Sequence, residues 1–313
     1  QFVMNQGFLI CTYEQTRSMF ITTNNYLHYD LVIFDESHRL KNKKSQLHQA
    51  SSMIKKNKSW MLSGTPLENN EEELINIFDI LGKNILNTSM SNKEISNKLS
   101  NYMLRRRKEE VLKDLPELIE QDVYIDMTKK QREEYETIYS GRNQLNLNDS
   151  GSIFSLITKL KLACNFSPES SESGKLEYLE NLLEEHQKNS RKVIVFSQYV
   201  KTLEYLQNYF NFESQIYHGG QDTSKKDMVI NTFKEKQGFD VLFMSLKAGS
   251  VGLNLQEAST VVLYDRWWNP AIESQAVARA HRMGRTEPVH AIKFITTRVN
   301  LDLASFKDDI WSH

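Results

Sequence analysis

Short apolar runs alternate with longer segments of helical periodicity along this chain, a pattern typical of α/β units built on a parallel sheet. In the first half, the runs predict strands at residues 8–11, 31–34 and 60–62. The second half carries the fuller predicted sheet, with strands at residues 193–196, 215–217, 241–244, 261–264 and 291–295. We therefore expect an α/β protein with two parallel sheets, the first of them the smaller.

A charged region of helical pattern separates the two groups of strands. It runs from about residue 71 to residue 162, Pro116 is its main breaker, and it predicts helices at residues 104–111, 129–139 and 156–162. Helices that protrude between two sheets would have this pattern.

The length of the chain indicates two domains. Its 313 residues are about twice a typical domain length. Residues that favour turns and flexible links gather at 143–152 and again at 167–174. We predict one domain at residues 1–145, with the helical protrusion, and a second at residues 146–313.

The net charge, the cysteines and the lengths of the apolar runs exclude only a few classes of protein. The 39 basic and 40 acidic residues leave a net charge of −1, so nucleic-acid binding requires a local basic patch. The two cysteines lie far apart, which argues against a structural zinc site and a disulfide framework and favours a reducing compartment. No apolar run has the length of a membrane span, so we expect no membrane partner.

Two carboxylates directly follow the strand predicted at residues 31–34. Open α/β sheets bind ligands beyond the carboxyl ends of their strands, which is where Asp35 and Glu36 lie. Nucleotide-bound Mg²⁺ takes hard oxygen ligands, and an adjacent carboxylate can orient the attacking water. Asp35 is therefore predicted to hold magnesium and Glu36 the water. Taken alone, the pair also fits an exposed acidic turn.

A late segment places two arginines at helical spacing. Residues 272–283 have a helical pattern that Gly284 would end as a C-terminal cap. Gln275, Arg279 and Arg282 fall at i, i+4 and i+7, which puts them on one face of such a helix. Two guanidiniums on one face suit the charge of a transferring phosphoryl group, although a solvated basic face has the same pattern.

These features belong to a series of motifs in a fixed order. The series comprises Thr12-Tyr13-Glu14; Asp35-Glu36-Ser37-His38 through Asn42; Ser63-Gly64-Thr65-Pro66-Leu67 through Asn70; Leu104-Arg105-Arg106-Arg107-Lys108 with Leu115-Pro116; Ser173-Gly174-Lys175-Leu176; Val195-Phe196-Ser197-Gln198; His218-Gly219-Gly220; Ser245-Leu246-Lys247-Ala248-Gly249 through Leu255; Trp267-Trp268-Asn269-Pro270; and Gln275-Ala276 through Arg285. In this order, over nearly the whole chain, they resemble the Snf2 family of superfamily 2 ATPases, and Arg266 to Pro270 resembles prokaryotic members.

The resemblance implies a fold and a set of roles. The fold would be two RecA-like lobes, the first incomplete, with parallel sheets and inserted helical protrusions. ATP and Mg²⁺ would bind between the lobes at Asp35, Glu36, His38, Gly249, Gly252, Gln275, Arg279 and Arg282. Double-stranded DNA would be tracked without sequence readout by Thr12, Ser197, Gln198, Ser245, Lys247 and Trp268. Packing of Trp268 against Pro270, and a merely solvated Lys247, remain alternatives.

One departure from the family concerns the phosphate-binding loop. Similar proteins carry a glycine-rich loop with a lysine and a hydroxyl about a hundred residues before the motif at Thr12, and no segment here matches it. We therefore expect upstream residues to be required for activity, and the 313 residues alone to hydrolyse ATP negligibly. The missing strand would also leave a sheet edge beside residues 31–34 that is sticky or covered.

Two other functions remain open at this stage. One is a strand-separating helicase of the same superfamily, and the other is a noncatalytic module that binds nucleic acid. For the translocase itself, a DNA-bound protein is a possible target. The site of action would be the nucleoid in the cytoplasm of a prokaryote, or the nucleus of a eukaryote.

Overall fold

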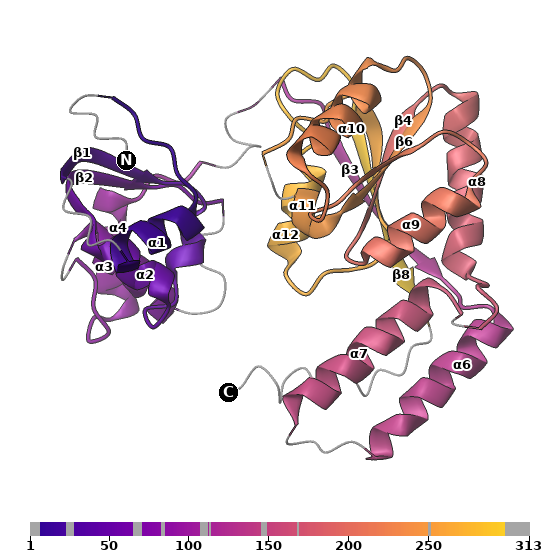
Figure 1. Cartoon of the computed structure of the whole chain (residues 1–313), viewed down its shortest axis with the longest axis horizontal. Coiled ribbons are helices and arrows are strands. Elements are labelled where there is room, and N and C mark those ends of the chain that lie inside the picture. Colours follow the sequence, from indigo (N-terminus) through magenta and orange to yellow (C-terminus); the bar gives the residue numbers. More distant parts are fainter. Residues whose placement is uncertain are drawn as a thin grey trace. The chain divides into compact units, whose positions relative to one another are not determined.

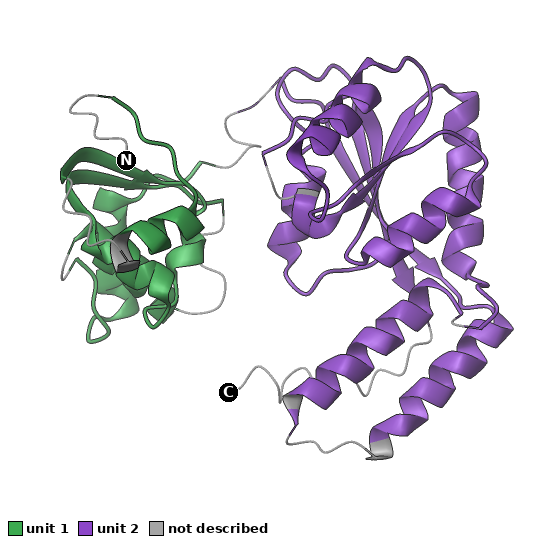
Figure 2. Cartoon of the chain, in the orientation of Figure 1, with its two compact units in different colours: residues 1–107 green, residues 108–313 purple. Residues whose placement is uncertain are grey.

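The structure is a computed structural model, which describes residues 7–22, 28–64, 71–82, 85–106, 112, 114–144, 149–167, 169–249 and 252–297. The chain divides into two compact units, residues 1–107 and residues 108–313 (Figure 2). Each unit has its own hydrophobic core. Among the described residues, no helix combines the length and the apolar character needed to cross a membrane.

Unit 1 combines a two-stranded parallel sheet with helices (Figure 1). Strand β1 (His28–Phe34) pairs with β2 (Lys55–Met61), and Ile33 lies opposite Trp60. The described helices are α1 (Tyr13–Thr22), the 3-10 helix η1 (Ser37–Leu40), α2 (Gln46–Met53), α3 (Glu71–Leu81) and α4 (Asn92–Tyr102). The strands predicted at residues 31–34 and 60–62 thus fall on β1 and on the end of β2.

The sheet of unit 1 is covered on one face within the described part of the chain. Phe34 packs with Leu40 and Ile80 in the core, because alternate strand residues point to opposite faces. On the other face Ile33 is 50% exposed and Trp60 57% exposed. An apolar face of this kind usually packs against another element, and no described residue covers it.

The strand predicted at residues 8–11 is wrong. These residues form no regular element, and Phe8 and Ile10 are almost fully exposed. An apolar run becomes a strand only where a neighbouring strand completes its hydrogen bonds, and the described strand β1 pairs with β2 alone.

Unit 2 is built on a six-stranded sheet in the order β3-β8-β7-β4-β6-β5, with every pair parallel. Its strands are β3 (Leu118–Ile125), β4 (Lys192–Ser197), β5 (Gln215–Tyr217), β6 (Asp240–Ser245), β7 (Ala258–Leu263) and β8 (Val289–Thr296). All five strands predicted for the second half are confirmed. β3 escaped prediction because Glu120, Gln121 and Asp122 interrupt its apolar pattern.

Helices cover both faces of this sheet (Figure 1). They are α8 (Gly174–Lys188), α9 (Val200–Tyr209), α10 (Thr223–Glu235), α11 (Leu246–Gly249) and α12 (Pro270–Val277). Val193 and Val195 of β4 enter one core cluster, whereas Ile194 and Phe196 enter the other. A continuous apolar run therefore marks a strand that is buried on both faces.

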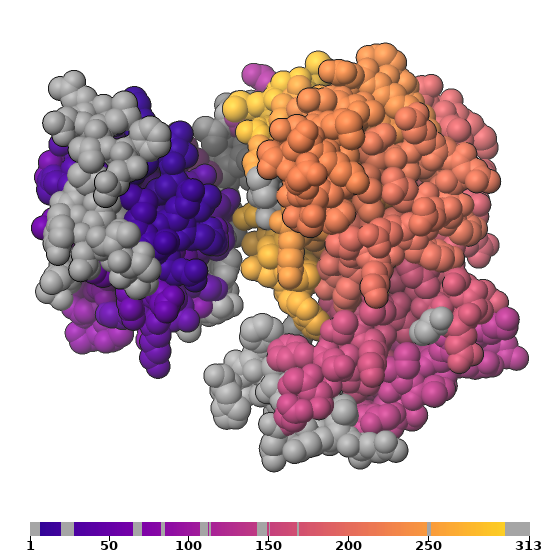
Figure 3. All heavy atoms as spheres, in the orientation of Figure 1, coloured from indigo at the N-terminus to yellow at the C-terminus, as the bar shows by residue number. Residues whose placement is uncertain are grey.

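A helical hairpin projects from the body of unit 2 (Figures 1 and 3). It consists of α6 (Lys129–Ser140), the short 3-10 helix η2 (Gly141–Gln144) and α7 (Ser150–Asn165), and it has a small core of its own. The helices predicted at residues 129–139 and 156–162 are confirmed within it. Residues 104–106 are not helical, and residues 107–111 of that predicted helix lie outside the described residues.

The division between the units falls at Arg107, earlier than the domain boundary predicted at residue 145. The reason is β3, which pairs along its whole length with β8 and so brings the following hairpin into unit 2. A polar stretch at 143–152 looked like a linker in sequence, but its described residues fall at the end of η2 and at the start of α7, within unit 2.

Candidate nucleotide and nucleic-acid sites

The acidic turn of unit 1 follows β1 directly. Glu36 has the left-handed conformation, with φ 49° and ψ 48°, which is unfavourable for a residue with a side chain. The Oδ1 atom of Asp35 accepts the Glu36 backbone N–H at 2.9 Å and so supports the turn. Strain of this kind persists only where the surroundings enforce it, and it is frequent at functional sites.

His38 connects this turn to the segment that follows β2. Its Nδ1 lies 3.3 Å from Glu36 Oε2, an ion pair when the imidazole is protonated, and 3.5 Å from Ser63 Oγ. The backbones also meet, since Ser37 N donates to Leu62 O at 2.8 Å. Ser63 therefore adjoins the acidic turn, whereas residues 65–70 lie outside the described residues.

The first predicted motif supports the same turn from α1. The Tyr13 hydroxyl donates to Asp35 O at 2.7 Å, and burial raises the pKa of that hydroxyl, so it stays a donor. Arg39 lies over the Tyr13 ring, 5.0 Å from its centroid, and donates to Glu14 at 2.8 Å. Thr12 caps α1 through its hydroxyl, which accepts a backbone N–H, and its side chain is exposed.

The acidic turn suits magnesium that arrives on a nucleotide. Among the described residues no group of three or more His, Cys, Asp or Glu side chains could form a metal site of protein ligands alone. Nucleotide-bound Mg²⁺ is usually held by one or two carboxylates and completed by phosphate and water oxygens. The exposed carboxylate of Asp35 fits that ligand set, with Glu36 beside it.

In unit 2 the predicted serines lie at the carboxyl ends of neighbouring strands. Ser197 ends β4, Ser245 ends β6, and the two are in register. Both side chains are buried, and their hydroxyls serve the fold: Ser245 Oγ accepts Ala248 N, whereas Ser197 Oγ donates to Asp265. Lys247, one residue into α11, is exposed, with its ammonium 5.6 Å from the Trp267 ring centroid.

The Gln198 turn is fixed by the segment after β7. Asp265 Oδ1 accepts Gln198 N at 3.0 Å, and Gln198 Nε2 donates to Arg266 O at 3.3 Å. Gln198 itself is half-buried. Its backbone is therefore held in one conformation beside the carboxyl ends of β4 and β7.

Trp268 lies on the surface of unit 2 with one ring face covered. The Lys161 ammonium from α7 lies 3.7 Å from its ring centroid and donates to Arg266 O at 2.9 Å. Burial lowers the pKa of Lys161 to about 8, against the opposing effect of Asp265. The indole remains 42% exposed. Trp268 thus lies on the protein surface, while Trp267 packs against the core.

Glu273 ties the tryptophan loop to α12. It pairs with Arg266 through two parallel hydrogen bonds, accepts the Trp267 backbone N–H at 2.6 Å, and is almost fully buried. Its carboxylate is the main reason that the pKa of Arg266 is raised. The loop after β7 and the start of α12 therefore form one connected structure.

The helix predicted at residues 272–283 is too long. α12 ends at Val277, and the chain continues in tight turns in which Arg279 N donates to Ala276 O and Ala280 N to Val277 O. Gly284 has the left-handed φ of 96°, but it lies in a later turn and caps no helix. Small side chains and the bond from Leu255 N to Arg279 O favour this turn over a continued helix.

Helix α12 therefore carries Gln275 but ends before both arginines. Gln275 is on α12, whereas Arg279 and Arg282 belong to the arginine segment, defined as residues 278–283. That segment packs beside the chain that follows Gly252: Arg282 Nη1 donates to Leu253 O at 3.5 Å. Gly249 ends α11, and Ser250 and Val251 between the two glycines lie outside the described residues.

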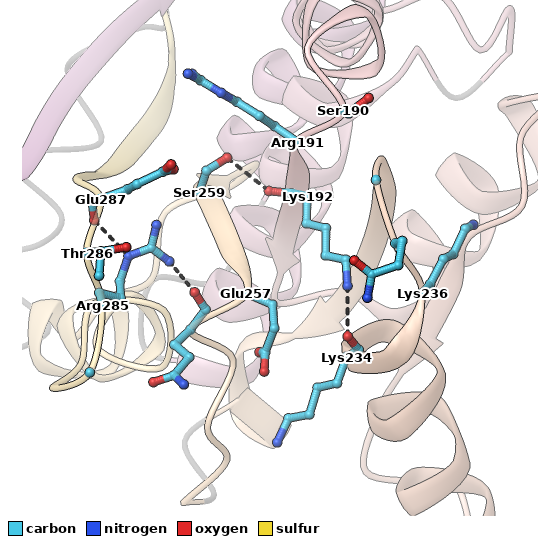
Figure 4. A pocket seen from close by; sticks show the side chains of 14 residues that line it. Ser190, Arg191, Lys192, Lys234, Lys236, Glu257, Ser259, Arg285, Thr286 and Glu287 are labelled. Atoms are coloured by element: carbon cyan, nitrogen blue, oxygen red, sulfur yellow. Dashed lines mark hydrogen bonds between the residues drawn. The ribbon is translucent and has the colours of Figure 1, made fainter.

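A different hollow lies at the amino ends of the strands, away from Ser197 and Ser245 (Figure 4). It has a volume of about 450 Å³ and several basic side chains. Its best-placed cations serve the backbone: Lys192 donates to Phe233 O and Lys234 O, and Arg285 donates to four carbonyls. These hydrogen bonds satisfy carbonyl oxygens at the carboxyl end of α10 and in turns, which is a structural role.

Several residues of these sites were missed in the sequence. Asp265 follows the apolar run at 261–264 just as Asp35 follows its own run, and that shared position was the available signal. Glu273 and Lys161 had no such signal, because their partners lie in a loop and on another helix.

Two α/β units on parallel sheets, with an acidic turn after β1 in one and an arginine segment after α12 in the other, have the architecture of a RecA-like ATPase core of the helicase class. The chain belongs to the Snf2-related family: the SNF2-related domain matches residues 1–168 and the helicase conserved C-terminal domain matches residues 174–284.

Relatives occur in bacteria and in eukaryotes. An uncharacterized ATP-dependent helicase of Mycoplasma pneumoniae is 32% identical over 313 residues, 92% of this chain and 30% of its own length. The putative ATP-dependent helicase/translocase YwqA of Bacillus subtilis is 30% identical over 86% of this chain and 33% of its own length. A human SWI/SNF-related regulator of chromatin is 29% identical over 86% of this chain and 30% of its own. The chain thus spans about a third of these proteins.

A solved structure supports the fold. The SWI2/SNF2 ATPase core domain of Sulfolobus solfataricus is 25% identical and superimposes with a TM-score of 0.51, over 91% of this chain and 66% of that one.

Proposed function

We propose that the protein containing these 313 residues is an ATP-dependent translocase on double-stranded DNA that remodels DNA or protein–DNA complexes. The observation that carries this proposal is the acidic turn, in which Glu36 is held in a left-handed conformation and joined through His38 to Ser63. Such a turn has a use in phosphoryl transfer, where one carboxylate serves the metal and the other the water. Membership of the Snf2-related family supports it.

For the nucleotide, we assign Mg²⁺ to Asp35 and the attacking water to Glu36. Arg279 and Arg282 would approach the phosphates from the arginine segment, together with Gln275 and the Gly249 and Gly252 turn. His38 would report the state of the acidic turn to Ser63. Closure of the two units on nucleotide would then supply contacts that are lost after hydrolysis, which is the difference that can drive movement.

For the nucleic acid, we assign an interface to the members of the predicted set that are not buried: Thr12 in unit 1, and the half-buried Gln198 with Lys247 and Trp268 in unit 2. Hydroxyls, amides and a lysine suit contacts to phosphates, which position a protein without reading sequence. Ser197 and Ser245 would contribute indirectly, since their buried hydroxyls stabilise the turns that carry the contacting residues. The name of the Bacillus subtilis relative, a helicase/translocase, agrees with this class of activity.

We also propose that the 313 residues alone hydrolyse ATP negligibly. Their sequence contains no glycine-rich loop followed by a lysine and a hydroxyl, and that loop holds the β- and γ-phosphates in P-loop enzymes. The chain should nevertheless bind duplex DNA through unit 2, because the proposed contacts there do not involve the loop.

The test is phosphate release by the full-length protein that contains this chain. We expect duplex oligonucleotides to stimulate turnover at least about tenfold more than single strands, and Arg282→Ala to lower it by about a thousandfold, the size of an arginine-finger effect. Arg191→Ala, an exposed arginine at the amino end of β4, is the matched control. Equal stimulation by single strands would instead indicate a strand-separating helicase, and unchanged activity in Arg282→Ala would refute the assigned finger.

A further inference from the structure

A buried polar network lies directly beneath the Gln198 turn. It joins three parts of unit 2: the last turn of α7 at Asn165, the first turn of α8 at Lys175, and the loop after β7 at Asp265. Asn165 is fully buried, and Asp265 and Lys175 are 4% and 5% exposed. Buried charges are rare unless they are paired, so this arrangement is costly to keep.

The amide of Asn165 lies between two opposite charges. Its Oδ1 accepts the Lys175 ammonium at 3.1 Å, and its Nδ2 donates to Asp265 Oδ2 at 3.1 Å. Only this orientation of the amide satisfies both neighbours, since an ammonium cannot accept and a carboxylate cannot donate. Lys175 also donates to Tyr264 O at 2.9 Å. The charges are thus linked through Asn165.

Asp265 connects this network to the turn after β4 by hydrogen bonds. Its carboxylate accepts three hydrogen bonds: from Ser197 Oγ, from Gln198 N and from Asn165 Nδ2. Ser197 Oγ in turn accepts Tyr199 N at 3.1 Å. The carboxylate of Asp265 therefore holds Ser197 Oγ and Gln198 N directly, and Tyr199 N through Ser197 Oγ.

We infer that Asn165, Lys175 and Asp265 are positioning residues for the nucleic-acid interface, which hold the Ser197–Gln198 turn in the conformation that contacts the DNA backbone. The inference rests on the proposed function, and it extends it to residues that touch no DNA. A turn that is already ordered loses less conformational entropy when it binds, so the network raises affinity without adding a contact.

The network also joins the helical hairpin to this interface. Asn165 and Lys161 are one turn apart on α7, and they contact Asp265 and Arg266 respectively. Gln131 of α6 donates to Ala163 O and accepts Gly174 N, so the base of the hairpin is bound to the same place. The hairpin and the DNA-facing turn therefore form one mechanical unit through Asn165.

Two substitutions separate positioning from simple charge effects. Asp265→Asn removes a negative charge near the DNA, so electrostatics alone would strengthen binding. An asparagine accepts at only one of its two polar atoms, however, so either Gln198 N or the Ser197 hydroxyl loses its acceptor. Asn165→Leu changes no charge and keeps the volume. Positioning predicts that both variants bind DNA more weakly.

The experiment measures the Kd of this chain for a duplex oligonucleotide at several salt concentrations, with hydrogen exchange of the amides of residues 197–199. We expect about a fivefold to tenfold weaker Kd in both variants, an unchanged salt slope because no phosphate-contacting cation is lost, and faster exchange at the turn but not in β6. Asn181→Leu is the matched control, since this exposed α8 asparagine bonds only to its own helix.

The outcomes distinguish the inference from the function on which it rests. If the unchanged chain binds no duplex DNA, the proposed function fails and the inference with it. If the chain binds but Asp265→Asn binds equally or more tightly, with the turn still protected from exchange, the inference alone fails. Should Asn165→Leu not fold, the nearly isosteric Asp265→Asn decides the question.

Discussion

Two carboxylates lie close to the carboxyl ends of parallel strands, Asp35 directly after β1 in unit 1 and Asp265 two residues after β7 in unit 2, and their environments are opposite. Asp35 is exposed, and its described side-chain bond is to the next backbone N–H. Asp265 is 4% exposed and accepts three hydrogen bonds. A carboxylate with open oxygens is available to a metal ion, whereas one with all its oxygens occupied is part of the scaffold.

The comparison teaches that the surrounding donors decide the role of a carboxylate at a strand end. At Asp35 the neighbouring side chains approach its backbone: Tyr13 donates to the Asp35 carbonyl oxygen. At Asp265 a hydroxyl, a side-chain amide and a backbone N–H all donate to the carboxylate itself, and Lys175 lies behind the amide. The first arrangement shapes a turn and leaves the Asp35 carboxylate accessible, whereas the second surrounds the Asp265 carboxylate with hydrogen-bond donors.

The largest expected effect is that of Glu36→Gln in the full-length protein, which tests whether the acidic turn takes part in ATP hydrolysis. If Glu36 orients the attacking water, ATP turnover should fall by about a hundredfold to ten-thousandfold in this variant, because that carboxylate is lost. The unfolding free energy should change by no more than about 1 kcal/mol, since the amide keeps the volume of this 40% exposed side chain and only the pairing with His38 is weakened. Phosphate release and thermal unfolding measure the two. Glu72→Gln, an exposed glutamate at the start of α3, is the control; unimpaired turnover in Glu36→Gln would show the turn to be structural.

The second prediction compares the two aspartates as alanine variants. Asp265→Ala should lower the unfolding free energy by about 3 kcal/mol, because it leaves Ser197, Gln198 N and Asn165 without an acceptor and the Lys175 charge without its counterion. Asp35→Ala should cost only about 1 kcal/mol, since it removes one exposed hydrogen bond, to the Glu36 backbone N–H. Chemical denaturation of the 313-residue chain measures both. Equal losses in the two variants would remove the distinction drawn here between an open and a closed carboxylate.

The sequence predicted the strands of unit 2 well because each is a continuous apolar run bounded by polar residues. It failed at β3, whose middle is polar, and at residues 8–11, whose apolar run lacks a described strand partner. Motif order located the acidic turn, the arginines and Trp268. It did not find the positioning network, because Asn165, Lys175 and Asp265 are distant in sequence and only their tertiary hydrogen bonds connect them.

The length of α12 shows a further limit. Periodicity alone extended the helix through Arg282, yet the chain leaves the helical path after Val277, where Leu255 N takes the carbonyl oxygen of Arg279. A bond to a segment more than twenty residues away cannot be read from local spacing. The arginines keep their proximity to the chain after Gly252, but by tertiary packing and not by helical phase.

The smallest effect concerns Lys161, on which the charge of Asp265 acts from a distance. Burial lowers the pKa of Lys161 to about 8, compared with about 10.4 in an unfolded chain. Below pH 8 the ammonium is charged in both states and the cost of burying it is fully present. Between pH 8 and 10.4 the unfolded chain binds more protons, so the unfolding free energy should rise with pH.

The measurement is the difference in unfolding free energy between the unchanged chain and Lys161→Met across pH 7 to 10.5. Taking the difference cancels the other shifted groups, including Lys175 and Lys192, whose pKa values are also lowered by burial. We expect a rise on the order of 1 kcal/mol, after allowance for solvent screening of a partly exposed side chain, and none for the exposed control Lys159→Met. Asp265 opposes the shift, whereas Lys175 reinforces it. Asp265→Asn should therefore move the rise to lower pH, and a rise that stays in place would mean that the closed carboxylate exerts no field beyond its own hydrogen bonds.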